Sequence, residues 1–242
     1  MSLSIKLWSR IIWRSFFIQG AWNFEGMQNI GFVYGLIPGL KDIYGGNRDK
    51  VEKAIERYID FFNTQPYMTP LIMGICLSQE KQGRPSVVGQ AKMSMAGALA
   101  AIGDSFFWGA LKPIVSLLAL MFVMINLIWG IILSLVLFNI VHIWIKVKGV
   151  KEGYGNGPGA VLRMGKVLSI ERIERIKYIL PFMVGVVLFI LPSYIGSGVS
   201  PAIGGWLFGG FIVFMFMNYL GISTSSSFYI GFIVLLIWSI IR

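Results

Sequence analysis

The sequence predicts an all-α integral membrane protein, folded as a multi-pass helical bundle with broken, re-entrant hairpins and an amphipathic N-terminal helix. Hydrophobic residues make up 56% of the 242 positions and charged residues 13%, about half the ~25% usual in globular chains. The mean hydropathy is +0.72. Two tracts, 113–145 and 179–241, contain no Asp, Glu, Lys or Arg, and each exceeds the ~20 apolar residues that cross a bilayer. Because a soluble helix would show a polar face, these tracts exclude an ordinary soluble enzyme.

The charge balance indicates membrane topology rather than a nucleic-acid partner. Lys and Arg number 21 against 11 Asp and Glu, but they are scattered in the linkers between apolar segments, as the positive-inside rule describes. The single cysteine, Cys76, excludes an intrachain disulfide framework and a multi-cysteine metal site. We expect no cofactor and no bound metal.

We treat 1–242 as one membrane domain, whose first segment, 1–60, is predicted to hold interfacial helices. Its first basic residues recur every four positions and form one helical stripe: Lys6, Arg10 and Arg14. A stripe of this kind opposite apolar residues is typical of a helix on an anionic membrane surface; a peripheral helix with solvated bases is the alternative. We expect the N-terminus at the cytoplasmic face. A second amphipathic helix is predicted after Asn47, a suitable N-cap.

The second segment, 61–113, is predicted to be a broken hairpin region. Pro66 and Pro70 each lack a backbone donor, so they break any helix there. A second apolar element, from Met93 to Pro113, is predicted to be interrupted at "IGDS". Two interrupted apolar elements of similar size are typical of transporters, in which unwound backbone lines a cavity or is buried in protein.

Three further segments complete the prediction. Residues 114–145 are predicted to form a long apolar helix. Taken over 113–145, a single helix would reach ~50 Å against a hydrocarbon core of ~30 Å, so it must tilt or bend near Asn126 and Gly130. Residues 146–178 are predicted to be a basic cytoplasmic linker.

Within this linker, "GYGNGPGAVLRMGK" is interpreted as a flexible loop, because five residues separate Gly159 from Gly165 where a phosphate-binding loop needs four. Residues 179–242 are predicted to hold the C-terminal spans 179–195, 201–221 and 228–241. In the second of these, closely spaced glycines suit helix pairing within the subunit or between subunits.

Four strings together resemble a known family: "QGAWNFEGMQNIGFVYGLIPGLKDIYG", "FFNTQPYMTPLIMG", "AAIGDSFFWGALKP" and "LFNIVH". They resemble the IID subunit of the mannose-family phosphotransferase system (PTS). The resemblance implies a multi-pass sugar permease subunit of the bacterial inner membrane that works with a IIC partner, in a homo-oligomer of IIC–IID pairs. The pair would carry a hexose or amino sugar inward, while soluble IIA and IIB proteins pass phosphate from phosphoenolpyruvate. The phosphorylated histidines of that relay belong to IIA and IIB, so this chain would perform no chemistry of its own.

The candidate substrate-binding residues lie at the two predicted breaks. Asn63, Thr64 and Gln65 precede Pro66, and side-chain amides offer sugar hydroxyls both a donor and an acceptor; capping and turn formation are the alternative. Asp104, in an apolar setting with Ser105, is either a helix N-cap or a sugar ligand, since burying an unpaired carboxylate costs several kcal/mol.

Four other residues complete the candidates. Trp108 lies one turn beyond Asp104 and either stacks on a sugar ring or packs. Glu25, Gln28 and Asn29 have the i, i+3, i+4 spacing of one helical face, and either bind substrate or contact the partner subunit. The only histidine, His142, is interpreted as a packing residue.

Two other functions are consistent with the sequence. The first is a non-transporting assembly scaffold for IIC. The second is an unrelated membrane enzyme with Asp104 or Glu25 as acid or base, but no second convergent titratable group accompanies either residue.

Overall fold

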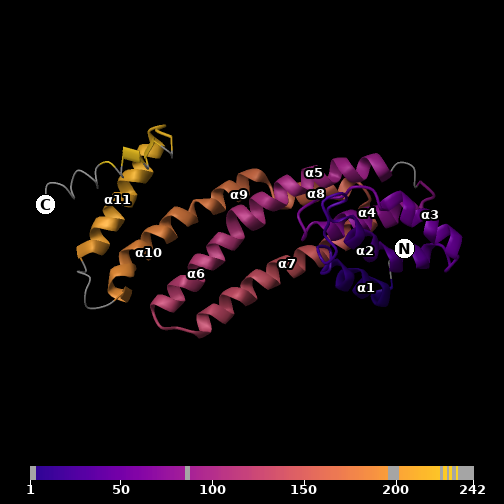
Figure 1. Ribbon diagram of the computed structural model, residues 1–242, viewed down its shortest axis with the longest axis horizontal. Coiled ribbons are helices and arrows are strands. Elements are labelled where there is room, and N and C mark those ends of the chain that lie inside the picture. The colour runs from indigo at the N-terminus through magenta and orange to yellow at the C-terminus, as the bar shows by residue number, and fades with distance from the viewer. Residues whose placement is uncertain are drawn as a thin grey trace. The chain divides into compact units, whose positions relative to one another are not determined.

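The computed structural model describes residues 4–84, 88–195, 202–223, 226–227, 229–230 and 233, and all of its named elements are helices (Figure 1). They are α1 (Ile5–Ser15), α2 (Asn29–Ile43), α3 (Arg48–Tyr58), α4 (Thr69–Lys81), α5 (Val88–Phe106), the π-helical turn η2 (Phe107–Leu111), α6 (Lys112–Met124), α7 (Trp129–Asn156), α8 (Gly159–Val167), α9 (Ile170–Lys177), α10 (Ile179–Ile195) and α11 (Ala202–Tyr219). The all-helical prediction is confirmed. Within the described residues, three stretches are long and apolar enough to cross a membrane: Lys92–Met124, Trp129–Asn156 and Gly159–Ile195.

The chain divides into two compact units. The first contains Met1–Leu111 and Leu137–Ile173, and the second contains Lys112–Val136 and Glu174–Arg242. In the first unit α2 packs against α1, α3 and α4, and α4 also packs against α5. The core of this unit includes Phe32, Leu36 and Ile72, each fully buried. The candidate site lies in this unit.

A buried carboxylate ties three helices of the first unit together. Glu80 of α4, 4% exposed, accepts hydrogen bonds from Arg57 of α3 at 2.9 and 3.1 Å and from the Tyr58 hydroxyl at 2.9 Å. The Tyr44 hydroxyl, just after α2, donates to the same carboxylate. Because a buried charge is tolerated only when it is paired and hydrogen-bonded, this network fixes α3 on α2 and α4. The predicted N-cap of α3 is also confirmed: the Asn47 side chain accepts from Lys50 N at 3.1 Å.

Glycines bring α4 and α7 into backbone contact. A Cβ on Gly74 would lie 2.5 Å from Val150 O, and a Cβ on Gly153 would lie 2.2 Å from Leu71 O. Only glycine permits such an approach, which is the small-residue packing of membrane helices.

The interpretation of "GYGNGPGAVLRMGK" as a flexible loop is wrong, because this segment forms the end of α7 and most of α8. The linker predicted over 146–178 is likewise mostly helical.

The two predicted breaks have different outcomes. Residues 61–68 are not helical and α4 begins at Thr69, so the break at Pro66 is confirmed. The break at "IGDS" is wrong, because α5 runs unbroken to Phe106. Glycine costs about 1 kcal/mol in a helix, but it keeps the backbone donor that proline lacks, so the helix continues. The irregularity comes just later, as the π-helical turn η2.

A single long helix over 114–145 is not observed, whereas the alternative that the tract bends near Asn126 is confirmed. Helix α6 ends at Met124 and α7 begins at Trp129, with Asn126 at φ 59° in the turn between them. Asparagine is among the few residues that adopt this left-handed conformation readily. The turn is tight, since a Cβ on Gly130 would meet the Phe122 side chain.

In the second unit, α10 packs against α6 and α11. A Cβ on Gly204 would lie 2.4 Å from Phe189 O, so this glycine serves a contact within the subunit; Gly205 and Gly209 face open space. The predicted spans at 179–195 and 201–221 correspond to α10 and α11. The predicted span at 228–241 lies almost entirely outside the described residues.

Candidate functional site

The proline-broken segment 61–68 is fastened by the amide of Gln28. Gln28 Nε2 donates to Thr64 O at 2.9 Å, and Thr64 N donates to Gln28 Oε1 at 3.2 Å. The Thr64 hydroxyl donates to Ala96 O of α5 at 2.8 Å. Both side chains are buried. Their polar groups are therefore used to hold the segment between α2 and α5, rather than to face a ligand.

Gln65 differs from these two residues because part of its amide is unused. Its Oε1 accepts from Tyr67 N at 2.6 Å, a local turn consistent with the extended conformation that Pro66 imposes on the preceding residue. Its Nε2 is buried and has no hydrogen-bond partner among the described residues. An unpaired buried donor costs about 1–3 kcal/mol, so this amide has a donor to offer to an oxygen ligand.

Gly103 lets α5 pack directly on Gln65. A Cβ at Gly103 would lie 2.6 Å from Gln65 Cβ and 3.0 Å from Met68 Cγ. The next residue, Asp104, is exposed, and Ser105 is half-buried. The N-cap interpretation of Asp104 is wrong, because this residue lies inside α5 rather than at a helix start. Asp104 is nevertheless the neighbour in sequence of Gly103, which is a residue at which α5 contacts the broken segment.

Aromatic rings join the segment to η2 and α7. The Tyr67 ring lies 5.9 Å from that of Trp108 and 4.5 Å from that of Phe107. On its other side it stacks on His142 at 4.7 Å, with an interplanar angle of 23°. Trp108 keeps 41% of its surface exposed, so part of this side chain is accessible from outside the unit. Since His142 is buried against Tyr67, the packing interpretation fits its position.

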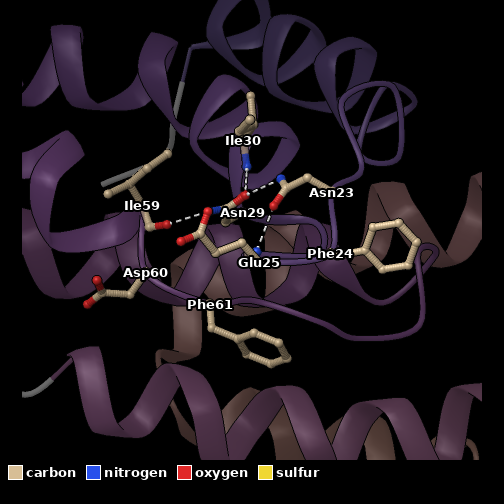
Figure 2. A pocket seen from close by; sticks show the side chains of 9 residues that line it. Asn23, Phe24, Glu25, Asn29, Ile30, Ile59, Asp60 and Phe61 are labelled. Carbon is tan, nitrogen blue, oxygen red and sulfur yellow. Dashed lines mark hydrogen bonds between the residues drawn. The ribbon is translucent and has the colours of Figure 1, made fainter.

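The other three candidates are divided between two places. Gln28 fastens the broken segment, whereas Glu25 and Asn29 line an open pocket of about 730 Å³ together with residues of 23–30 and 59–61 (Figure 2). The shared helical face predicted for them is wrong, because α2 begins only at Asn29 and Glu25 lies in the preceding turn. Asn23, Gly26 and Met27 make a hydrogen-bonded turn there instead.

Asn29 is at the centre of this pocket. Its Oδ1 accepts from Asn23 Nδ2 at 3.2 Å and from Ile30 N at 2.8 Å, and its Nδ2 donates to Ile59 O at 2.6 Å (Figure 2). These bonds use the amide to join the turn to the end of α3. The exposed carboxylate of Glu25 is therefore the more accessible group of the pair.

Sequence reasoning missed Tyr67 and Gly103. Tyr67 was missed because an aromatic residue after a proline is a common packing residue, and nothing in the sequence shows that its ring contacts η2 and α7. Gly103 was interpreted as a point of interruption. Its actual role, close packing, is the other common use of glycine in membrane helices.

The fold and the site together define a helical membrane protein in which the non-helical segment 61–68 packs against α2, α5 and α7. Residues 2–191 match the family described as "PTS system mannose/fructose/sorbose family IID component". Because this match covers most of the chain, the protein belongs to that family, as the resemblance predicted.

Individual relatives agree with this family. The mannose-specific EIID component of Escherichia coli (strain K12) is 35% identical over 158 residues, which is 63% of this chain and 56% of that protein. The fructose permease IID component of Bacillus subtilis (strain 168) is 33% identical over 150 residues, 60% of this chain and 54% of that protein. The matched part of the chain thus spans little more than half the length of these relatives.

A solved structure is also similar. In the cryo-EM structure of the mannose transporter ManYZ in complex with microcin E492, one chain aligns with a TM-score of 0.61 at 30% identity, over 78% of this chain and 71% of that chain. A second structure, described only as a membrane protein, aligns with a TM-score of 0.68 at 31% identity over the same shares.

Proposed function

We propose that this subunit, together with a IIC partner, binds a hexose or amino sugar and carries it inward for phosphorylation by a IIB protein. Soluble IIA and IIB would supply the phosphate from phosphoenolpyruvate, and this chain would perform no chemistry itself. The names of the relatives, which include mannose-specific, fructose and sorbose-specific components, support a sugar as the substrate class.

The observation that carries this proposal is the unused Nε2 of Gln65. A buried amide donor without a partner favours a ligand oxygen. It lies in the segment that packs on Gly103 of α5, and Gly103 is the neighbour in sequence of the exposed Asp104. A carboxylate, an amide donor and a partly exposed tryptophan are the groups from which sugar sites are built, because hydroxyls need donors and acceptors and a pyranose ring has an apolar face.

The division of roles proposed for the nine candidates uses the hydrogen bonds of Gln28, Thr64, Gln65 and Asn29 and the positions of the others, among which Asn63 is exposed in the broken segment. We assign sugar contacts to Asn63, Gln65, Asp104, Ser105 and Trp108. Thr64 and Gln28 hold the segment. Glu25 and Asn29 belong to the open pocket near α3, which suits contact with the partner subunit as well as it suits substrate.

The membrane arrangement is part of the proposal. We place α1 and α3 at the membrane interface with the N-terminus at the cytoplasmic face of the bacterial inner membrane, and the segment 61–68 at a re-entrant turn toward a wet cleft. The 1–60, 61–113, 114–145, 146–178 and 179–242 segments then serve as interfacial, hairpin, apolar, cytoplasmic and spanning parts of one domain. The homo-oligomer is built from IIC–IID pairs.

The test is reconstitution. The chain is placed in vesicles with and without IIC and IIB, and phosphoenolpyruvate-dependent formation of sugar phosphate is measured in the presence of IIA and the general PTS proteins. We expect activity only when both membrane subunits and IIB are present. Activity of this chain without IIC would contradict the two-subunit function. Unchanged activity when every sugar-contact residue is replaced would favour a scaffold that only supports its partner.

A further inference from the structure

Two lysines of the first unit are buried in stretches long and apolar enough to span a membrane: Lys92 is the first residue of Lys92–Met124, and Lys146 lies within Trp129–Asn156. Lys92 of α5 and Lys146 of α7 are each 1% exposed. Among the described residues, neither has a carboxylate within ion-pair distance. An ammonium group in such a setting is costly, and ionisable residues inside membrane segments generally serve a function.

Lys92 binds the end of α3. Its Nζ donates to Tyr58 O and to Asp60 O, each at 3.3 Å, and Tyr58 is the last residue of that helix. Carbonyls at a helix C-terminus carry partial negative charge and favour a cation. The same Nζ lies 5.8 Å from the ring centroids of Phe32 and Phe62, which is cation–π distance.

Lys146 repeats this arrangement at the end of α1. Its Nζ donates to Ser15 O at 2.8 Å and to Ser15 Oγ at 3.3 Å, and Ser15 is the last residue of α1. The Nζ lies 4.5 Å from the ring centroid of Phe16 and 5.8 Å from that of Tyr67. Each lysine thus joins a helix C-terminus to two aromatic rings.

The rings reached by the two lysines bracket the candidate sugar segment. Phe62 immediately precedes residues 63–66 and faces Lys92, while Tyr67 immediately follows them and faces Lys146. Gln65 lies between these two anchored rings. The ends of the segment are therefore fixed from two different helices, and each fixing cation also caps one of the short helices α3 and α1.

We propose that Lys92 and Lys146 are paired positioning residues, which hold the two ends of the 63–66 segment so that its amides meet the sugar in one geometry. This inference rests on the proposed sugar-binding role of that segment. The lysines touch no sugar. They act through Phe62 and Tyr67, and a cation at these positions would be favoured by the helix-end carbonyls and by the ring faces.

The experiment compares Lys92→Met and Lys146→Met, which keep side-chain length but remove the cation, with Lys92→Arg and Lys146→Arg. Lys148→Met is the matched control: Lys148 lies on the same helix and its Nζ faces Trp144 at 4.6 Å, away from the segment. All variants are purified and reconstituted as the full complex with IIC. Two quantities are measured: KM and maximal rate of sugar phosphorylation, and hydrogen–deuterium exchange of the 61–68 backbone.

We expect each methionine variant to raise KM about tenfold, with a maximal rate within about twofold of wild type. Exchange over 61–68 should accelerate in the same variants. The arginine variants should have a KM and an exchange rate over 61–68 close to those of the wild type. Lys148→Met should change neither quantity. Wild-type KM and wild-type exchange in both methionine variants would overturn the proposal. Loss of maximal rate with unchanged KM would overturn it as well, because a positioning role acts on binding.

A second pair of variants decides the case if the methionine proteins fail to assemble. Phe62→Leu and Tyr67→Leu leave the lysine–carbonyl hydrogen bonds in place and remove only the rings at the segment's ends. A raised KM with faster exchange over 61–68 supports the positioning role of the two lysines, and wild-type values of both quantities overturn it. If the wild-type complex transports no sugar, the proposed function fails. The comparison of hydrogen–deuterium exchange over 61–68 between the variants and the wild type still tests the positioning role of the lysines independently.

Discussion

At the scale of single residues, a proline and a glycine determine which groups Gln65 can offer. Pro66 removes a backbone donor and holds Gln65 in an extended conformation, so its Oε1 turns back to Tyr67 N while its Nε2 stays unpaired. Gly103 then lets α5 approach within contact of Gln65 Cβ. The sequence indicated the first of these effects, because the consequences of proline are local. It did not indicate the second, because close packing depends on what lies opposite the glycine.

This contact gives a prediction at Gly103. Gly103→Ala places a methyl 2.6 Å from Gln65 Cβ. Two non-bonded carbon atoms cannot lie this close, so the segment 61–68 must shift away from α5. We expect the KM for sugar to rise roughly tenfold, equivalent to about 1.4 kcal/mol, with the assembled complex intact. The measurement is sugar phosphorylation by reconstituted vesicles. Gly97→Ala, on the same helix with no atom within 4 Å of the new methyl, is the control; equal KM values in the two variants would contradict the proposed packing role.

A second residue-scale prediction concerns pH. Burial raises the pKa of the Tyr58 phenol above its ordinary value of 10.0, and Cys76 and Glu80 raise it further. A group with a raised folded-state pKa stabilises the fold below its unfolded pKa, and this stabilisation is lost as the pH rises. We therefore expect the free energy of unfolding to fall above about pH 10.

The variant Tyr58→Phe separates the two contributions of this phenol. It should lower the free energy of unfolding at pH 7 by roughly 1.5–3 kcal/mol, because a charged acceptor loses a hydrogen bond, and it should flatten the alkaline decline. Denaturant unfolding of the detergent-solubilised protein at pH 7 and pH 11 checks both. Tyr178→Phe, at an exposed tyrosine, controls for general alkaline effects. An alkaline decline as steep in Tyr58→Phe as in the wild type would refute the assignment.

At the scale of helices and turns, the sequence predicted correctly those features that depend on a few neighbouring residues. Pro66 and the cap at Asn47 were interpreted correctly, since a missing donor and a side-chain cap act within a few residues. The glycines of "IGDS" and "GYGNGPG" misled, because glycine accompanies both turns and close helix contacts. Only the three-dimensional partners distinguish the two: Gly103 meets Gln65, and Gly153 meets Leu71 O.

The α4–α7 contact gives the element-scale prediction. Gly153→Ala introduces a methyl 2.2 Å from Leu71 O, and overpacking of this kind typically costs about 1–3 kcal/mol. Gly155→Ala, two residues along α7, meets nothing within 4 Å and should stabilise the helix by up to about 1 kcal/mol. Unfolding in mixed detergent micelles measures both. Opposite signs are expected, and equal destabilisation in the two variants would show that α4 and α7 do not touch there.

At the scale of the whole molecule, composition alone predicted a helical membrane protein, and four sequence strings indicated the family that the comparisons then showed. Composition did not indicate that Leu137–Ile173 returns to join the N-terminal unit, because such long-range contacts leave no periodic signal. The proposed site lies wholly within that unit. The nine predicted site residues therefore fall in one compact unit. We assign them three roles there: contact with the sugar, fastening of the broken segment and lining of the open pocket near α3.

The most direct measurement of the central claim is photo-crosslinking of a diazirine-bearing sugar to the reconstituted IIC–IID complex, followed by mass spectrometry of the labelled peptides. We predict that label on this chain is concentrated in the peptides carrying Asn63, Gln65, Asp104 and Trp108, and that excess unlabelled sugar removes it. Sugar-protected label confined to other peptides, in either subunit, would contradict the account.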